Sequence, residues 1–283
     1  MLISELLKHG SKTLQKNNIS THLLDSELFL SNLLNINREK ILTSNDQEVS
    51  ENIICNFNQL IKKRLKREPV AYLFKEKEFW SKKFIVNNST LIPRPETEML
   101  VERIIKYFKN KKIYILDIGT GSGCILLTLL DQMKKSKGIG IDISNKAIDI
   151  ALKNSKKFKL INKSKFFNRS LDQIFGYKFD LIVSNPPYIA RHQLKNLDED
   201  IKNFEPKIAL DGGNDGLDLI KKVIYKTKNI LKLNGMLALE IGNEQIDKVS
   251  KILLKNNFKV EHIIKDYKEN VRGVISTYIK YEQ

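Results

Sequence analysis

The sequence has little cysteine and histidine, and it lacks long apolar runs. Its 283 residues include two cysteines, Cys55 and Cys124, which are far apart, and four scattered histidines. A disulfide framework needs paired cysteines and a zinc centre needs clustered ligands, so neither is expected and no metal is predicted. No stretch reaches the length of a membrane span, and the residues after Met1 lack a secretory signal. A cytoplasmic globular protein without membrane contact is therefore expected.

Arginine is also scarce for a protein of this charge. The formal net charge is +16, yet only eight of the 49 basic residues are arginine, and the lysines are spread along the whole chain. Dedicated phosphate-binding surfaces favour clustered arginine, which binds phosphate in a bidentate manner. The charge is therefore weak support for nucleic-acid binding, and direct binding is not expected. The densest basic cluster, residues 62–67, is typical of the solvated face of a helix, with a contact to RNA or a ribosome-bound partner as the alternative.

The first quarter of the chain has leucine and isoleucine at helical spacing. Apolar residues recur every three or four positions in residues 2–14, 23–34 and 53–65, which predicts amphipathic helices that each bury one face. Because no catalytic constellation occurs here, the sequence predicts a small helical bundle, residues 1–68, that packs or recognises a partner. Residues 69–92 alternate in polarity and carry aromatics, which predicts a β-hairpin linker.

The rest of the chain, residues 93–283, has the pattern of an α/β domain. Buried strands alternate with helices, and the first strand, residues 113–118, leads into a glycine-rich turn. Such a turn can cradle a dinucleotide pyrophosphate, but the spacing is not GxGxxG and Asp117 would repel a pyrophosphate. Asp117 suits an ammonium group instead, and Asp142, which ends the next strand, suits the two hydroxyl groups of a ribose.

This ordered set of acidic residues and glycines predicts S-adenosylmethionine as the cofactor. The adenine is expected beside the segment that follows the third strand. The residues expected to bind the cofactor are Asp117, Gly119, Thr120, Gly121, Ser122, Gly123 and Asp142, with Ser170, Leu171 and Asp172 near the adenine.

A second motif, residues 185–188, which we call the clamp, follows the apolar run at residues 179–183. Two prolines end this run, which predicts a buried strand whose carboxyl end opens onto a crevice, where open α/β sheets bind ligands. Proline lacks a backbone N–H, so the carbonyl groups of Asn185 and Pro186 are expected to remain free as acceptors beside the Asn185 side chain. With the flat ring of Tyr188, they suit the planar –NH2 group of an amide or an exocyclic amine. Alone, the tetrapeptide would fit an ordinary tight turn.

Several motifs, taken in order over nearly the whole chain, resemble the HemK/PrmC family, methyltransferases that modify the glutamine of the Gly-Gly-Gln motif in bacterial peptide chain release factors. They are Arg67-Glu68-Pro69, Glu78-Phe79, Ile92-Pro93-Arg94-Pro95-Glu96-Thr97-Glu98, the turn from Asp117 to Gly123, Asn185-Pro186-Pro187-Tyr188, and the loop from Pro206 to Leu217. Lys75 stands where the family usually has a glycine in the hairpin, and Leu171 stands where it often has a tryptophan against the adenine.

The resemblance implies an α/β fold of the class I S-adenosylmethionine-dependent methyltransferases, with a Rossmann-like seven-stranded sheet, a β-hairpin linker and an N-terminal helical bundle that recognises the release factor. It implies methylation of the glutamine side-chain amide nitrogen, N5, which modulates translation termination. Asn185 would contact the cofactor, Asn185, Pro186, Pro187 and Tyr188 would bind the glutamine, and Asn185, Pro186 and Tyr188 would be catalytic.

Two alternatives stay open at this stage. A nucleic-acid adenine N6-methyltransferase would use a similar clamp for the adenine amine, and the net charge favours it mildly, but the chain has no recognisable DNA-reading module. A catalytically inactive RNA- or ribosome-binding protein would not need the acidic and glycine residues of the cofactor pattern.

Overall fold

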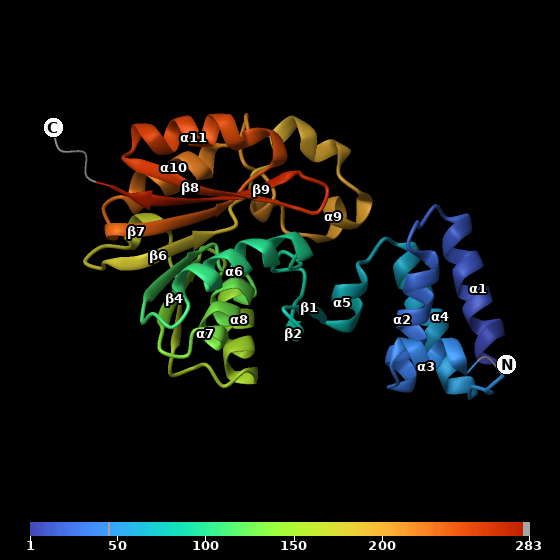
Figure 1. The fold of residues 1–283 in the computed structure, drawn as a ribbon. Helices are drawn as coiled ribbons and strands as arrows, with labels where there is room; N and C mark the ends of the chain where they lie inside the picture. The colour runs from blue at the N-terminus through green and yellow to red at the C-terminus, as the bar shows by residue number, and fades with distance from the viewer. Residues whose placement is uncertain (45, 280–283) are drawn as a thin grey trace. The chain divides into compact units, whose positions relative to one another are not determined.

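The computed structural model describes residues 1–44 and 46–279, so Asn45 of the predicted helical bundle and residues 280–283 of the predicted catalytic domain lie outside it. The chain forms two compact units (Figure 1). The first unit comprises Met1–Phe74 with Glu199–Phe204, and the second comprises Lys75–Asp198 with Glu205–Gln283.

The first unit is helical, and its core consists of leucine, isoleucine and phenylalanine side chains. The three predicted amphipathic segments are helices α1, α2 and α4, and three short helices accompany them. Residues Val70 and Phe74, which the sequence placed in the hairpin, are helical because their side chains pack against this core. The helices are α1 (Ile3–Lys16), α2 (His22–Leu34), α3 (Arg38–Thr43), α4 (Glu51–Leu65), α5 (Val70–Phe74) and α9 (Glu199–Phe204).

The basic cluster at residues 62–67 is only partly a solvated face. Lys62 and Lys63 are exposed, as expected, but Arg64 is buried and pairs with Asp25 and Asp200, each at 2.7 Å. The prediction was wrong for Arg64 because its side chain lies on the face of α4 that packs against α2. Its ion pair with Asp200 also fixes α9 to this unit.

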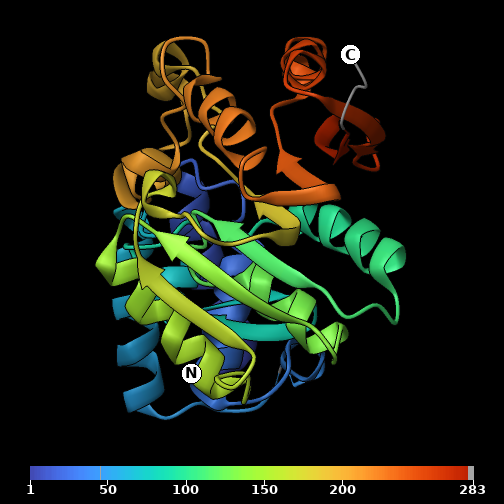
Figure 2. The same ribbon diagram turned by 90° about the vertical axis from the view of Figure 1, so that its left-hand side faces the viewer.

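The second unit contains a mostly parallel sheet of seven strands in the order β5-β4-β3-β6-β7-β9-β8, which confirms the predicted Rossmann-like α/β fold. Strand β9 runs antiparallel to the other six strands, and the strands twist across the sheet (Figure 2). The strands are β3 (Tyr114–Ile118), β4 (Lys137–Asp142), β5 (Ser164–Asn168), β6 (Phe179–Ser184), β7 (Leu231–Glu240), β8 (Phe258–Lys265) and β9 (Val271–Tyr278).

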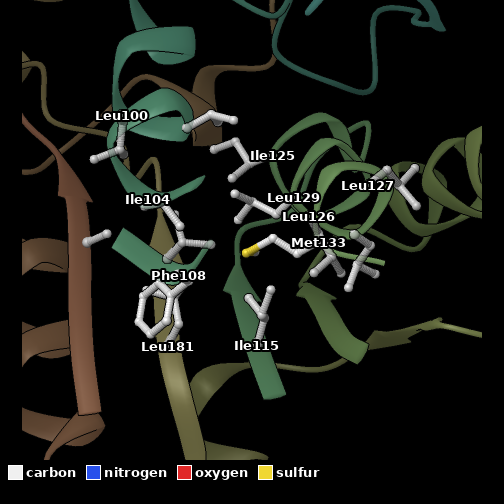
Figure 3. Packing of buried hydrophobic residues seen from close by; sticks show 14 of the residues in the cluster. Leu100, Ile104, Phe108, Ile115, Ile125, Leu126, Leu127, Leu129, Met133 and Leu181 are labelled. Atoms are coloured by element: carbon white, nitrogen blue, oxygen red, sulfur yellow. The ribbon is translucent and has the colours of Figure 1, made fainter. Parts of the chain in front are cut away.

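Helices cover both faces of this sheet, because alternate strand residues point to opposite sides. Ile115 and Leu181 belong to one buried cluster with residues of α6 (Pro95–Phe108), α7 (Cys124–Gln132) and α8 (Asn145–Lys157), and the close-up of this core shows the residues of α6 and α7 (Figure 3). Leu116 and Ile182 pack on the other face against α10 (Asp218–Thr227) and α11 (Ile246–Lys255). Short 3-10 helices occur at η1 (Leu171–Gln173), η2 (Arg191–Asn196), η3 (Lys207–Ala209) and η4 (Asn243–Gln245).

A two-stranded hairpin, β1 (Glu76–Phe79) and β2 (Lys82–Ile85), packs on the same unit. Its turn residues Trp80 and Ser81 both have positive φ, as a two-residue turn of the primed type requires. Lys75 has a φ of 57°, a left-handed conformation that glycine adopts at least cost. This explains the glycine at that position in the family pattern.

Candidate active site

The site is built at the carboxyl edge of β3, β4 and β6. These strands are parallel and in register, with Asp117 opposite both Gly140 and Val183, so the segments that follow them meet at one edge. A cavity of about 430 Å³ opens there, a volume typical of small-molecule sites. Its lining comes from residues 89–97, 118–125, 141–146, 169–171 and 206–209, with Asn185, Pro187, Leu219 and Lys222.

The glycine-rich turn leaves room for a ligand over its main chain. Gly119 and Gly121 have φ values of 69° and 56°, and a Cβ on Gly119 would meet no atom within 4 Å. Thr120 and Ser122 line the cavity beside them, whereas Gly123 lies at the N-terminus of α7. A turn with open space above its backbone is a cradle that a bound group can fill, so this geometry fits the predicted cofactor.

The two acidic residues of the predicted cofactor site have different surroundings. Asp117 lies beneath the turn, is buried, and accepts a hydrogen bond from the Thr120 hydroxyl at 2.6 Å. Its Oδ1 has no hydrogen-bond partner among the described residues, and burial raises the pKa of Asp117 to about 7. Such a carboxylate gains from a nearby cation, since an opposite charge favours the ionised form.

Asp142 lines the cavity itself. Its oxygens accept hydrogen bonds from the backbone N–H groups of Gly121, at 3.0 Å, and Ser144, at 2.9 Å. Burial raises the pKa of Asp142 as well. A carboxylate has about four acceptor positions, so two remain for the hydroxyl groups of a ribose. The acidic and glycine residues therefore fit S-adenosylmethionine.

The segment after β5 is placed partly as expected. Ser170 and Leu171 line the cavity, but Asp172 does not, and it forms ion pairs with Lys222 at 2.5 Å and Lys226 at 3.1 Å. The expectation for Asp172 was wrong because these two lysines of α10 hold its carboxylate. Leu171 remains the apolar residue of this segment that lines the cavity.

The clamp follows β6, and its acceptors are free. Asn185 and Pro187 line the cavity, while Pro186 is buried and Tyr188 is partly buried. Within the described ranges, no hydrogen-bond donor reaches the Asn185 side chain or the carbonyl oxygens of Asn185 and Pro186. The clamp therefore has free acceptor oxygens next to the cavity, although Pro186 and Tyr188 themselves are not among the residues that line it.

Sequence reasoning missed Glu240, which lies next to the clamp. Glu240 ends β7, is buried, and accepts hydrogen bonds from the Thr97 hydroxyl at 2.6 Å and from the Tyr188 hydroxyl at 3.4 Å. Burial raises the pKa of Glu240 to about 7, and burial together with the charge of Glu240 raises the pKa of Tyr188. An acidic residue at the end of an apolar run is the same signal that pointed to Asp117 and Asp142.

An ion pair between a partly exposed arginine and a buried glutamate joins two segments along the cavity. Arg94, in the proline-bracketed segment before α6, pairs with Glu205, whose side chain is 1% exposed. Glu205 also accepts a hydrogen bond from the backbone N–H of Ile92 at 3.1 Å. Because Arg94, Pro206, Ile208 and Ala209 line the cavity, this pair fixes one side of it.

The described part of the chain holds no group of three or more histidine, cysteine, aspartate or glutamate residues arranged to bind a metal ion. In residues 1–44 and 46–279, none of the helices has the length and apolar character that crossing a membrane requires.

Comparison with known proteins decides the family. Family models match the PrmC N-terminal domain at residues 5–74 and the methyltransferase small domain at residues 95–203. The release factor glutamine methyltransferase of Buchnera aphidicola subsp. Baizongia pistaciae is 41% identical over 82% of this chain and 83% of its own length. The chain belongs to the release factor glutamine methyltransferase family. A protein of the same name from Buchnera aphidicola subsp. Acyrthosiphon pisum is 39% identical over 96% of this chain and 97% of its own.

Solved structures agree on the fold of the second unit. A methyltransferase from Pyrococcus furiosus matches with a TM-score of 0.55 and 16% identity, over 77% of this chain and 100% of its own. At this identity the likeness shows the fold alone. Together with the family, it establishes an S-adenosylmethionine-dependent methyltransferase.

Proposed function

We propose that this protein methylates the side-chain amide nitrogen, N5, of the glutamine in the Gly-Gly-Gln motif of peptide chain release factors. The observation that carries the proposal is the pair of free acceptors at Asn185, which lines the cavity beside the glycine-rich turn, and at the adjacent Pro186, which is buried next to it. The family membership supports the substrate, because the relatives are named for it. The reaction would take place in the cytoplasm, where translation terminates.

The cofactor would be held by residues of the turn and of two strand ends. Gly119 to Gly123 would cradle the amino acid part, Asp142 would accept from the ribose hydroxyl groups, and Leu171 would contact the adenine. Asn185 would contact both cofactor and substrate. When bound, S-adenosylmethionine supplies an electrophilic methyl group on a sulfonium.

The clamp would overcome the poor nucleophilicity of an amide, whose nitrogen lone pair is delocalised into the carbonyl. The Asn185 side-chain oxygen and the Pro186 carbonyl would each accept one N–H of the glutamine amide, which fixes the direction of the lone pair. The ring of Tyr188 would hold the amide plane. Catalysis would consist mainly of positioning and of stabilising the growing acidity of the N–H groups.

Methylation of an amide nitrogen releases one proton, and the two acceptor oxygens of the clamp can assist this release. The amide enters with two N–H bonds and leaves with one N–H and one N–methyl bond, so one proton departs after transfer. Directly after methyl transfer the amide nitrogen carries a positive charge, which makes its N–H groups strongly acidic. No strong base is therefore needed before the transfer. The two acceptors would favour the loss by hydrogen bonding to the departing proton.

The test is methyl transfer from labelled S-adenosylmethionine to a purified release factor and, in parallel, to duplex DNA and ribosomal RNA, with the product mapped by peptide mass. We expect one methyl group on the Gly-Gly-Gln glutamine, absent when that glutamine is replaced. Label on nucleic acid with none on the release factor would instead favour the adenine N6 alternative. No binding of S-adenosylmethionine in calorimetry would favour an inactive binding protein.

The helical bundle is proposed to recognise the release factor. It contains no candidate catalytic group of its own, and the model of the PrmC N-terminal domain covers residues 5–74 of it. Binding to the isolated release factor should therefore weaken when exposed residues of this unit, such as Leu23, are replaced by a charged residue.

A further inference from the structure

One side chain, that of Gln245, holds the backbone at the end of the clamp. Gln245 lies in η4, directly after β7. Its Nε2 donates to the carbonyl oxygen of Tyr188 at 2.9 Å and to that of Gly216 at 3.2 Å, and its Oε1 accepts from the Gly242 N–H at 2.9 Å. A single carboxamide thus joins the clamp, the end of β7 and the loop at residues 211–216, which we call the glycine loop.

The glycine loop packs against the same stretch of backbone. A Cβ on Gly216, whose φ is +75°, would lie 2.4 Å from the carbonyl oxygen of Tyr188, and one on Gly212 would lie 2.7 Å from that of Pro187. Only glycine lets the main chain approach this closely. The Tyr188 carbonyl therefore accepts from Gln245 and is packed against Gly216, and the Pro187 carbonyl is packed against Gly212, in contrast to the free acceptors at the start of the clamp.

This contrast indicates how the clamp obtains its direction. Rotation of the peptide at Tyr188 would turn the preceding peptides with it, because the chain is continuous, and proline restricts φ at both positions before it. Because the ring of Pro187 fixes its φ, holding the Tyr188 carbonyl leaves the Pro186 carbonyl, two residues earlier, fewer orientations, and it also anchors the backbone that carries the Tyr188 ring. The hydroxyl of that ring is fixed separately by Glu240.

We propose that Gln245 is a positioning residue for methyl transfer, which acts by donating two hydrogen bonds that set the backbone of the clamp. The inference rests on the function proposed above. On this proposal, the rate of methyl transfer depends on the two N–H donors of the Gln245 carboxamide and not on the size of the side chain. A carboxylate of the same shape would keep the bond from Gly242 but would repel the two carbonyl groups.

The test compares Gln245→Glu with the wild-type protein and with Glu244→Gln, a control at the exposed neighbouring position. Steady-state methyl transfer is measured with the release factor varied, and affinity for S-adenosylmethionine by calorimetry. We expect kcat to fall about 10- to 100-fold in Gln245→Glu, as for a small misplacement of reacting groups. KM for the release factor, cofactor affinity and the thermal midpoint should change little, and Glu244→Gln should match the wild type.

The pH dependence separates positioning from a structural defect. Protonation restores one O–H donor to the introduced glutamate, so the ratio of variant to wild-type kcat should rise as the pH is lowered from 8 to 6. Gln245→Met, which has a similar length and no donor, should lose activity without this recovery, and it replaces Gln245→Glu if the latter does not fold. Equal kcat in wild type, Gln245→Glu and Gln245→Met would overturn the role of Gln245 alone. A wild-type protein without methyl transfer to the release factor would overturn the proposed function and this inference together.

Discussion

Glu240→Gln should stabilise the protein at alkaline pH, by removing a buried charge beside the clamp. Burial raises the pKa of Glu240 from 4.5 to about 7. One pKa unit corresponds to 1.36 kcal/mol, so the ionised side chain costs the folded state about 3 kcal/mol above pH 8. The carboxamide can accept from one neighbouring hydroxyl and donate to the other, so the contacts with Thr97 and Tyr188 can persist.

The sign of the pH dependence follows from the raised pKa. The stability that Glu240 contributes is complete below pH 4.5, the unfolded value, and is lost as the pH rises through about 7. Urea unfolding of wild type and Glu240→Gln should therefore give similar free energies at pH 5 and a gain of about 2 to 3 kcal/mol for the variant at pH 8.5. Asp117, whose pKa is also raised to about 7, is present in both proteins, so its contribution cancels in the difference between their unfolding free energies.

Glu244→Gln, at an exposed position of the same segment, is the matched control and should show no pH-dependent gain. A Glu240→Gln variant that is less stable than the wild type by the same amount at both pH values would refute the reasoning. In that case the carboxylate would stabilise the fold through its hydrogen bonds by more than its burial costs.

Asn185→Ala should reduce turnover by at least about 100-fold while S-adenosylmethionine still binds, because the amide loses its main acceptor; activity like that of the wild type would contradict this. Asp142→Ala should weaken cofactor binding about 10- to 100-fold in calorimetry, since hydrogen bonds to a charged group are lost. Arg64→Met should destabilise the helical unit by about 3 to 5 kcal/mol in urea unfolding, because Asp25 and Asp200 lose their partner, whereas exposed Lys63→Met should have little effect.

Much of the fold was predictable because the central strands β3, β4 and β6 of the second unit are buried on both faces. Buried parallel strands are continuous apolar runs, and carboxylates or prolines mark their ends, as at Asp142 and Pro186. The glycine turn was predictable for a related reason, since glycine adopts the positive φ found at Gly119 and Gly121 at the least cost.

Long-range contacts could not be predicted in the same way. Arg64 and Asp200 are 136 positions apart, and nothing in the local pattern around Arg64 distinguishes it from the exposed Lys63. Residues 70–74 form a continuous apolar run, which a strand and a helix can both accommodate, and packing against the helical core decided the conformation. Local patterns report which face is apolar, but not which distant segment covers it.

The clamp alone does not choose between a glutamine amide and the amine of adenine, since both present a planar –NH2 group with two N–H donors. The basic residues around it bear on the choice. Arg94 pairs with Glu205, Arg191 pairs with Asp211 at 3.0 Å, and Lys222 pairs with Asp172. A nucleic-acid substrate would require such cations for its phosphates, and binding would release counterions from them. Because Lys146 and Arg169 also line the cavity and form no ion pair among the described residues, these pairs do not decide the substrate by themselves, and membership of the release factor glutamine methyltransferase family is what favours a polypeptide amide.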